Sequence, residues 1–457
     1  MDQPATPRDP TALPVRVPLA SRPLGVMETL GTARRNLLEL IPEIATRQPM
    51  VSGRTVKRWH MVMDPGANRR ILKDALGTYP KSDVTKLILR PAIGESLFVA
   101  EGAHWLWQRR AAAPAFSPRH VEALAPVMTA AAERAARRIG QTAGRQANLF
   151  DEMVTATFEV IADVTLSGTP AFDRAEVHRA INAYIDTTAK VSLLDIIGAP
   201  TWVPRLSRLR AGPVLRTMRS MADRAIAERR GTGPSLPPDL LDLLLEGADP
   251  ETGRRMSTAE LRDNLLTFIV AGHETTALTL AWALYLCAFD PSIQIRARAE
   301  ASAVLGNRAA QVTDLPALSL CRRIIDETLR LYPPAAFLSR TARGPDRLCG
   351  REIRRGDTVM LPIYALHRNH LLWPDPDRFD PDRFLDPDRI DRFAYLPFGG
   401  GPRICIGASF ALQEATIILA TLLARFRFEP VAGRDPEPAL ILTLRPEGGV
   451  WLCATPA

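Results

Sequence analysis

Residues 398–407 read Phe-Gly-Gly-Gly-Pro-Arg-Ile-Cys-Ile-Gly, and this segment constrains the fold more than any other. Its glycines carry no side-chain bulk, so the backbone can approach a flat cofactor closely. Residues 408–423 follow with the apolar spacing of a helix, which places Cys405 just before a helix N-terminus. The exposed N–H groups and the dipole of such an end stabilise a thiolate. We therefore expect Cys405 to be a thiolate ligand of a metal ion.

Cys405 also belongs to a wider pattern of fixed residues. The spacing Phe398-x-x-Gly401-x-Arg403-x-Cys405-x-Gly407 resembles the signature of the cytochrome P450 superfamily, the haem-thiolate monooxygenases. The resemblance implies that haem b is the cofactor, that Cys405 binds its iron, and that Phe398, Arg403 and Gly407 contact the haem. A thiolate ligand donates electron density to haem iron and so favours O–O cleavage. The alternative, a glycine-rich turn around a small buried cysteine, explains fewer of these residues.

The clearest secondary-structure signal is one long helix. Ser257-x-x-Glu260 is a capping box, and Asp290-Pro291 marks the far end. About thirty residues between them predict a helix of roughly 45 Å. Apolar residues surround its second half, so we expect it to run through the core. A second helix, 318–331, is predicted to stop at Tyr332-Pro333-Pro334.

The remaining pattern predicts a mainly α fold with a minor β portion. An apolar stretch broken by glycine and proline, 191–212, is interpreted as a loop. Further helices are expected at 65–77, 105–113, 123–142, 150–167 and 174–190, and strands at 56–62, within 335–363, and in a hairpin of 440–444 with 450–453. The resemblance implies one cytochrome P450 domain over 1–457, without a fused reductase, in which haem lies between the long helix and the cysteine loop. A proline-rich segment, 1–27, precedes it.

The long helix carries Ala271-Gly272-His273-Glu274-Thr275-Thr276 near its middle. A threonine hydroxyl can bond back to its own helix and bend it, and Gly272 is expected to leave space for O2. In the family that this chain resembles, the matching acid and threonine deliver protons, so Glu274 and Thr275 are the expected catalytic residues. His273 has no second ligand four residues on and is not expected to bind metal.

Several basic residues are candidates for binding the haem propionates. Trp105-x-x-x-Arg109 places an indole N–H and a guanidinium on one helix face, and both can donate to a carboxylate. The family uses this pattern for a propionate, and Arg340 matches a further propionate-binding arginine. His367 and His104 are weaker candidates.

Glu327 and Arg330 lie three residues apart on one helical face. The family's Glu-x-x-Arg pair is joined by a downstream arginine, which Arg383 matches. The resemblance implies that these three form a structural triad that holds the cysteine loop.

The resemblance also places the substrate pocket. It implies lining by the loop 84–97, by part of the long helix, by residues 334–338 and by a turn near residue 442. The residues expected there are Leu265, Phe268, Ile269, Ala271, Phe337 and Leu442. Their apolar character predicts an apolar small-molecule substrate.

Charge and cysteine usage limit the partners. The formal net charge is +8, and the basic residues are scattered without a basic tract, so nucleic-acid binding is not expected. A basic surface favours an acidic electron donor, and the resemblance implies a separate ferredoxin or flavodoxin that passes on electrons from NAD(P)H. The five cysteines form no CxxC or CxxCH motif, and no signal peptide or transmembrane anchor is apparent. We expect a soluble, cytoplasmic protein with non-covalent haem.

Three alternatives remain open. A haem-based gas sensor would not need the Glu274–Thr275 pair. A peroxide-driven hydroxylase would form product without electrons from a partner. A structural helical protein without haem would leave Cys405 reactive towards thiol reagents.

Overall fold

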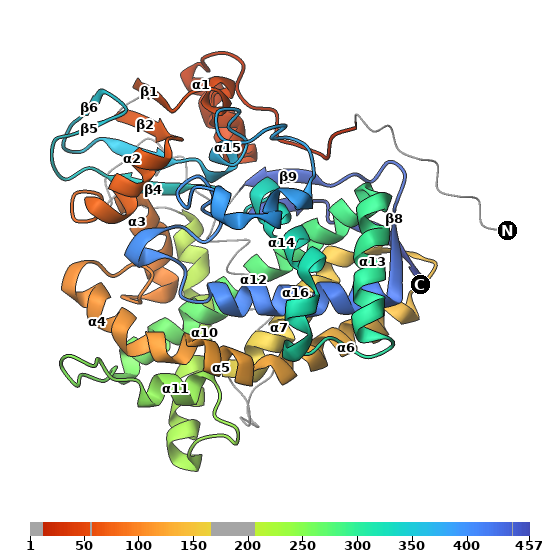
Figure 1. Cartoon of the computed structure of the whole chain (residues 1–457). Helices are drawn as coiled ribbons and strands as arrows, with labels where there is room; N and C mark the ends of the chain where they lie inside the picture. The colour runs from red at the N-terminus through yellow and green to blue at the C-terminus, as the bar shows by residue number, and fades with distance from the viewer. Residues whose placement is uncertain (1–11, 55–56, 166–205, 441) are drawn as a thin grey trace.

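The computed structural model describes residues 12–54, 57–165, 206–440 and 442–457. Helices dominate and strands form a minor part, as predicted (Figure 1). The helices are α1 (Val26–Arg35), α2 (Pro65–Arg69), α3 (Asp83–Ile93), α4 (Gly102–Ala112), α5 (Pro118–Ala123), α6 (Ala125–Gln141), α7 (Leu149–Thr165), α10 (Leu206–Thr232), α11 (Leu240–Glu246), α12 (Thr258–Phe289), α13 (Pro291–Leu305), α14 (Ser319–Leu331), α15 (Ile363–Leu366) and α16 (Ala408–Arg425). The predicted helix 174–190 and most of the predicted loop 191–212 lie outside the described residues.

The strands form separate groups: one lies beside α2 and α3, and another lies at the far end of α16, beside α13 (Figure 1). One sheet has the order β1-β2-β7-β4, a second β3-β11-β8, and two further sheets pair β9 with β10 and β5 with β6. The strands are β1 (Met50–Arg54), β2 (Arg58–Val62), β3 (Gln146–Asn148), β4 (Leu338–Thr341), β5 (Asp346–Leu348), β6 (Arg351–Ile353), β7 (Thr358–Leu361), β8 (Phe426–Pro430), β9 (Glu437–Leu440), β10 (Leu444–Glu447) and β11 (Trp451–Pro456).

The predicted long helix is α12. The Ser257 hydroxyl accepts a hydrogen bond from the Glu260 N–H, and the Glu260 carboxylate accepts one from the Ser257 N–H at 2.9 Å, which confirms the capping box. Every residue from Thr276 to Phe289 is buried, which confirms the path through the core. Trp282 stacks flat on Tyr332 with ring centroids 4.0 Å apart, so α12 is tied to the end of α14.

The structure corrects two predictions of secondary structure. The hairpin expected from residues 440–444 and 450–453 does not form, because β10 pairs with β9 while β11 pairs with β8 and β3. The predicted loop ends earlier than expected, because α10 already begins at Leu206. The helix expected at 65–77 is confirmed over residues 65–74, where α2 continues as a wider helical turn from Arg70 to Asp74.

Part of the proline-rich N-terminal segment belongs to the core. Tyr285 accepts a hydrogen bond from the Val15 N–H at 3.0 Å, and Tyr332 donates to the Val15 carbonyl at 2.5 Å. Tyr364 accepts from the Val17 N–H at 3.0 Å. Three tyrosine hydroxyls from different elements therefore fix residues 15–17.

One helix of the described residues, α16, is long and apolar enough by itself to cross a membrane. It lies 72% buried within the fold, as expected for the core helix of a globular protein. The successive helices α12 and α13 meet at 114° and are also packed against the core.

Candidate functional site

The cysteine loop turns sharply before α16. Gly399 and Gly401 have φ of 72° and 67°, and the Cys405 N–H donates to the Phe398 carbonyl at 2.9 Å. A Cβ on Gly401 would lie 2.2 Å from the Leu72 carbonyl oxygen. Gly401 is therefore required by the turn and by neighbouring backbone. A Cβ on Gly407 would meet only Phe116, at 3.9 Å, so protein packing does not explain that glycine.

Cys405 is accessible to solvent, yet enough protein surrounds its thiol for desolvation to act on it. Desolvation raises the pKa of its thiol, while the Gly407 N–H and the charges of Arg109 and Lys81 act in the opposite direction. The Gly407 N–H and the two cationic side chains all favour the thiolate, and a bound metal ion would add further positive charge beside the sulfur. The surroundings of Cys405 therefore suit a metal-bound sulfur.

A cluster of cations lies close to this loop. Lys81 pairs through its backbone with Arg340, and the Arg403 guanidinium contacts the Glu101 carboxylate and donates to the Ala100 carbonyl at 3.0 Å. Desolvation and the charges of Arg340 and Arg403 hold the pKa of Lys81 well below its usual range. Three cations thus surround one acid, which leaves two positive charges without a carboxylate among these four side chains.

Of these three cations, Arg340 most clearly lacks an anionic partner among the described side chains. Arg340 is 5% exposed, its Nε has no hydrogen-bond partner, and its Nη1 donates to the Ser339 carbonyl at 3.0 Å. Desolvation and the charge of Arg403 lower the pKa of Arg340 to about 10. Buried cations normally have an anionic partner, and the two propionates of haem would balance the cluster. The residues present therefore fit haem, with Cys405 as the iron ligand.

Trp105 and Arg109, which were predicted to act together, contact different parts of the cysteine loop. The Arg403 guanidinium lies over the Trp105 ring, 4.4 Å from its centroid, so Trp105 supports a residue of the cation cluster. Arg109 donates to the Ile404 carbonyl at 3.0 Å, directly beside the cysteine. The second tryptophan, Trp107, donates to His104 at 3.3 Å and lies under Arg254.

Ala271 and Thr275 are more exposed than the residues that follow them on α12, whereas His273 and Glu274 between them are buried. Ala271 is exposed, and Thr275 is partly exposed and donates to the Ala271 carbonyl at 2.7 Å, as predicted for a hydroxyl that bonds back to its helix. A Cβ on Gly272 would lie 3.2 Å from the Ile161 side chain. Gly272 thus allows α7 to pack closely, and the prediction that it opens space for O2 lacks support. His273 contacts the Ile269 carbonyl at 3.0 Å, as a satisfied core residue does.

Glu274 does not stand free beside Thr275. Its Oε1 accepts hydrogen bonds from the Thr443 hydroxyl at 2.8 Å and from Arg445 Nε at 2.6 Å. Arg445 Nη2 lies 2.5 Å from the same oxygen. The predicted proton-delivering acid is therefore held by the C-terminal strand β10.

Two aromatic or aliphatic side chains connect the cysteine loop with segments that were expected to line the substrate pocket. The Phe116 ring lies beside Gly407 and packs edge-on against Phe268 of α12, with centroids 5.1 Å apart. Leu338 lies beside Gly399. The predicted loop 84–97 is mostly the helix α3, and its end is tied to α12 through Leu97 N–H and Asn264 at 2.9 Å. Of the other residues expected in the pocket, Leu265 and Ile269 are buried on α12, while Phe337 and Leu442 are half-buried against the core.

The expected structural triad is assembled. Glu327 and Arg330 are fully buried and joined by two hydrogen bonds of 2.7 and 2.8 Å, and Arg383 Nε lies 3.2 Å from the Glu327 carboxylate. Arg330 also donates to the His367 carbonyl at 2.8 Å, and the His367 ring accepts the Leu396 N–H at 2.8 Å. The triad thus reaches the cysteine loop through His367, which does not lie among the propionate candidates.

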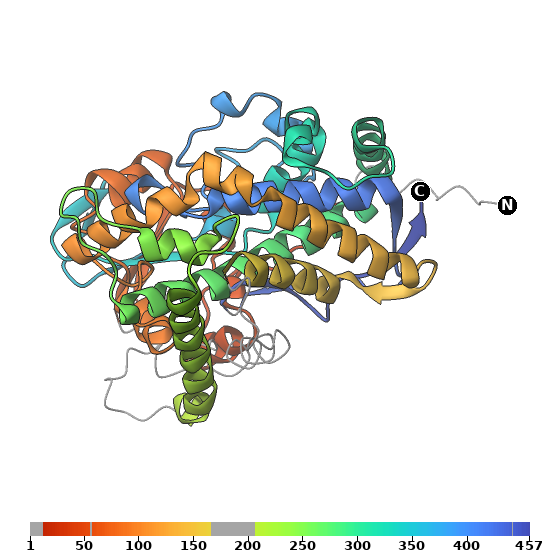
Figure 2. The same ribbon diagram turned by 90° about the horizontal axis from the view of Figure 1, so that it is seen from below.

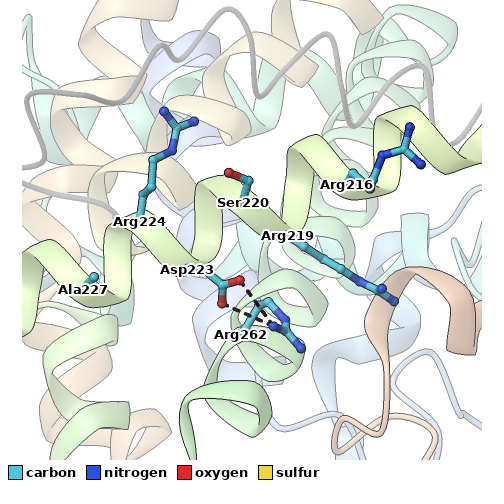
Figure 3. Close-up of a pocket in the computed structure, with 7 residues that line it drawn as sticks. All are labelled: Arg216, Arg219, Ser220, Asp223, Arg224, Ala227 and Arg262. Atoms are coloured by element: carbon cyan, nitrogen blue, oxygen red, sulfur yellow. Dashed lines mark hydrogen bonds and ion pairs between the residues drawn. The ribbon is translucent and has the colours of Figure 1, made fainter.

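A cavity of about 500 Å³ lies elsewhere, between α10 and the start of α12 (Figure 3). Figure 2 shows α10 projecting from the body of the molecule. The cavity is lined by Arg216, Arg219, Ser220, Asp223, Arg224, Ala227 and Arg262. Its four arginines set it apart from the apolar residues that were predicted to line the substrate pocket.

Sequence reasoning missed four residues of the site: Lys81, Glu101, Phe116 and Arg445. A lone lysine, acid, phenylalanine or arginine carries no periodic signal, and each reaches the site from a distant element. The one sequence feature that bears on Lys81 is the rarity of lysine in this arginine-rich chain.

The family model described as Cytochrome P450 matches residues 50–454. Cyclooctat-9-en-7-ol 5-monooxygenase from Streptomyces melanosporofaciens is 33% identical over 451 residues, which cover 94% of each chain. Putative cytochrome P450 132 from Mycobacterium tuberculosis is 35% identical over 412 residues, 86% of this chain and 87% of the relative. The crystal structure of the cytochrome P450DA heme domain matches with a TM-score of 0.80 and 28% identity, covering 90% of both chains.

Proposed function

The chain belongs to the cytochrome P450 family of haem-thiolate monooxygenases, and we propose that it inserts one oxygen atom of O2 into an apolar organic substrate. The reaction is R–H + O2 + two electrons + two protons giving R–OH and water. The observation that carries this proposal is the position of Phe116, whose ring lies beside Gly407 of the cysteine loop and packs against Phe268 of α12. An apolar molecule held against this part of α12 would lie next to the cysteine loop.

The chain's own residues have separate tasks in this proposal. Cys405 holds the haem iron, and Lys81, Arg340 and Arg403 bind the propionates. The bound haem-thiolate supplies O2 binding and O–O cleavage. Thr275 and Glu274 pass protons from solvent towards the O2 site, while the buried side chains of α12 exclude bulk water.

The substrate class follows from the lining. Leu265, Phe268 and Ile269 offer an apolar surface without a charged anchor, so recognition rests on shape and on the area buried. The name of the Streptomyces relative describes oxygenation of an unsaturated alcohol, cyclooctat-9-en-7-ol, which is consistent with a substrate that is mostly hydrocarbon. We propose hydroxylation or epoxidation of such a compound.

In this proposal the protein is soluble and cytoplasmic. Its electrons come from NAD(P)H through a separate ferredoxin or flavodoxin. The formal charge of +8 favours an acidic donor. Arg110 contributes little to a docking surface, because Asp249 binds it at 2.7 Å and Glu251 at 2.5 Å. The docking surface therefore has to use other basic residues.

Turnover of apolar compounds under isotope-labelled O2, with NAD(P)H and a ferredoxin system, tests the proposal. We expect label from O2 in the product, and less product per electron pair in Thr275→Ala. Product formed from peroxide alone and undiminished in Thr275→Ala would favour the peroxide-driven alternative. Binding of gases without any product would favour the sensor.

A further inference from the structure

The cavity between α10 and the start of α12 carries an excess of positive charge (Figure 3). Four of its seven lining residues are arginines, and Asp223 is the only acid among the seven. Asp223 accepts a hydrogen bond from Arg262 at 3.3 Å, and Asp263, outside the lining, lies 3.5 Å from the Nε of the same arginine. Both of these carboxylates therefore neutralise Arg262. Four arginines and two carboxylates leave two positive charges unbalanced.

The other three arginines, Arg216, Arg219 and Arg224, have no carboxylate within ion-pair distance in the part of the chain that the structure describes. Arg219 donates to the Pro91 carbonyl of α3 at 2.8 Å, but its Nε is buried without a hydrogen-bond partner. Arg216 and Arg224 are exposed at the edge of the cavity. A buried N–H without an acceptor costs free energy, so the cavity favours a ligand that brings oxygen acceptors.

Arginines on α6 show how the chain balances such a cluster elsewhere. Arg134 and Arg138 contact three carboxylates of α7 at distances of 2.7–3.4 Å. The cavity beside α10 has no comparable set of acids among the described residues. An anion from outside the chain would balance its charge.

The cationic side chains border the cavity on two sides. Figure 3 shows Arg216 and Arg224 pointing to one side of α10 and Arg219 to the other side, where Arg262 lies. Arg216 and Arg224 are eight residues apart on α10, which is roughly 12 Å along the axis, and Ser220 lies midway between them. Arginine side chains at exposed positions can change rotamer, so guanidinium groups from both sides can approach an anion beside Ser220.

A phosphate group fits this set of donors. A phosphate monoester carries about two negative charges at pH 7 and offers three strong acceptor oxygens. Guanidinium groups bind phosphate through two parallel hydrogen bonds. A carboxylate would balance only one of the two excess charges.

We propose that this cavity binds the phosphate group of a small molecule through Arg216, Arg219, Arg224 and the Ser220 hydroxyl. The phosphate belongs either to a soluble ester or to a lipid headgroup, since both present the same chemistry. The inference goes beyond the proposed function and does not depend on it, because none of these side chains takes part in binding haem or in proton delivery.

Calorimetric titration of the haem-loaded full chain with inorganic phosphate, at constant ionic strength, tests the inference. Haem has to be bound, because the cation cluster at Lys81 would otherwise offer a second anion site. We expect one saturable site, with binding at least about 10-fold weaker in Arg216→Gln and in Arg224→Gln, because each variant loses charged hydrogen bonds to the anion. Acetate, with one charge, should bind more weakly than phosphate.

The matched control is Arg137→Gln on α6, which removes the same charge from a side chain that is 61% exposed. Arg216 and Arg224 are also exposed, so their substitution should leave the fold intact. Equal phosphate affinity in all three variants, or no saturable binding by the unmodified protein, would overturn the inference.

Glycerol 3-phosphate and vesicles that contain phosphatidic acid distinguish the two sources of phosphate. Vesicle binding that is lost in Arg224→Gln would support the site and identify a lipid headgroup as its ligand. Displacement of phosphate by glycerol 3-phosphate, without vesicle binding, would support the site and identify a soluble ester.

Discussion

Arg330 Nε lies 2.7 Å from Glu327 Oε2, and both side chains are completely buried. A buried pair of this kind stabilises little by itself, but removing one partner leaves an uncompensated charge. Arg330 also donates to the carbonyls of His367, Pro376 and Arg378. The pair therefore fixes the irregular chain that leads to the cysteine loop.

Glu327→Gln should destabilise the fold by about 3–5 kcal/mol, because it leaves Arg330 buried without an anion. The measurement is the midpoint of chemical unfolding, together with the fraction of protein that retains haem. Glu352→Gln is the matched control, because Glu352 pairs with Arg354 at the surface, where both side chains are more than half exposed. A loss no larger than that of the control would contradict the structural role of the triad.

The pH dependence of stability should involve His367. Burial and the Arg330 charge lower the pKa of His367 to about 3, so the folded protein keeps this ring neutral while the unfolded chain protonates it below about pH 6.5. Stability from this group is thus fully present above pH 6.5 and is lost as the pH falls towards 3, by up to about 1.4 kcal/mol per pH unit.

His367→Gln removes this titration. The amide can donate to the Arg330 carbonyl and accept the Leu396 N–H, as the imidazole does. The melting temperature of the variant should therefore fall less steeply than that of the unmodified protein between pH 7 and pH 5. Parallel pH profiles would show that His367 is not the responsible group.

Arg340→Gln should stabilise the haem-free protein but weaken haem retention in the haem-bound protein. Without haem the variant should be more stable, because Arg340 is a buried cation whose desolvation is uncompensated. With haem it should lose the cofactor faster to an acceptor protein, because a propionate loses its partner. Arg347→Gln, at an exposed position of β5, is the control. Slower or equal haem loss would contradict the propionate assignment.

Alanine substitutions at two glycines with similar backbone angles distinguish the cost of backbone strain from the cost of steric overlap. Gly401 and Gly433 have φ of 67° and 72°, but a Cβ would meet the Leu72 carbonyl only at Gly401. Gly433→Ala should cost about 1–2 kcal/mol from the left-handed conformation alone. Gly401→Ala should cost clearly more and should reduce haem content. Equal losses in thermal unfolding would indicate that the close approach to Leu72 has no effect.

Local sequence signals predicted the elements that local physics determines. The capping box at Ser257 and the break at Asp290 are short-range features, and both ends of α12 lie where they were expected. The C-terminal hairpin was misassigned because strand pairing depends on distant partners. Val450 and Trp451 carry a strand pattern, but nothing near them in sequence indicates that β8 is the partner.

The candidate site was predictable where residue spacing carried the chemistry. Cys405, Arg403 and the Glu327–Arg330 pair follow from motifs within a few residues. The partners Lys81, Glu101 and Arg445 come from segments far away in sequence. Lys81 and Glu101 act through charge in the cation cluster, and Arg445 acts through its ion pair with Glu274. No periodicity or spacing connects Arg445 with Glu274, so only the fold places them together.

The absorption spectrum of the dithionite-reduced, carbon monoxide-bound protein tests the central claim most directly, with Cys405→Ala as the comparison. The account predicts a strongly red-shifted Soret band that is lost in Cys405→Ala, as expected for haem with a thiolate ligand. A band at the position typical of histidine ligation, or well-folded protein without a haem band, would contradict the assignment of Cys405 and the proposed reaction with it.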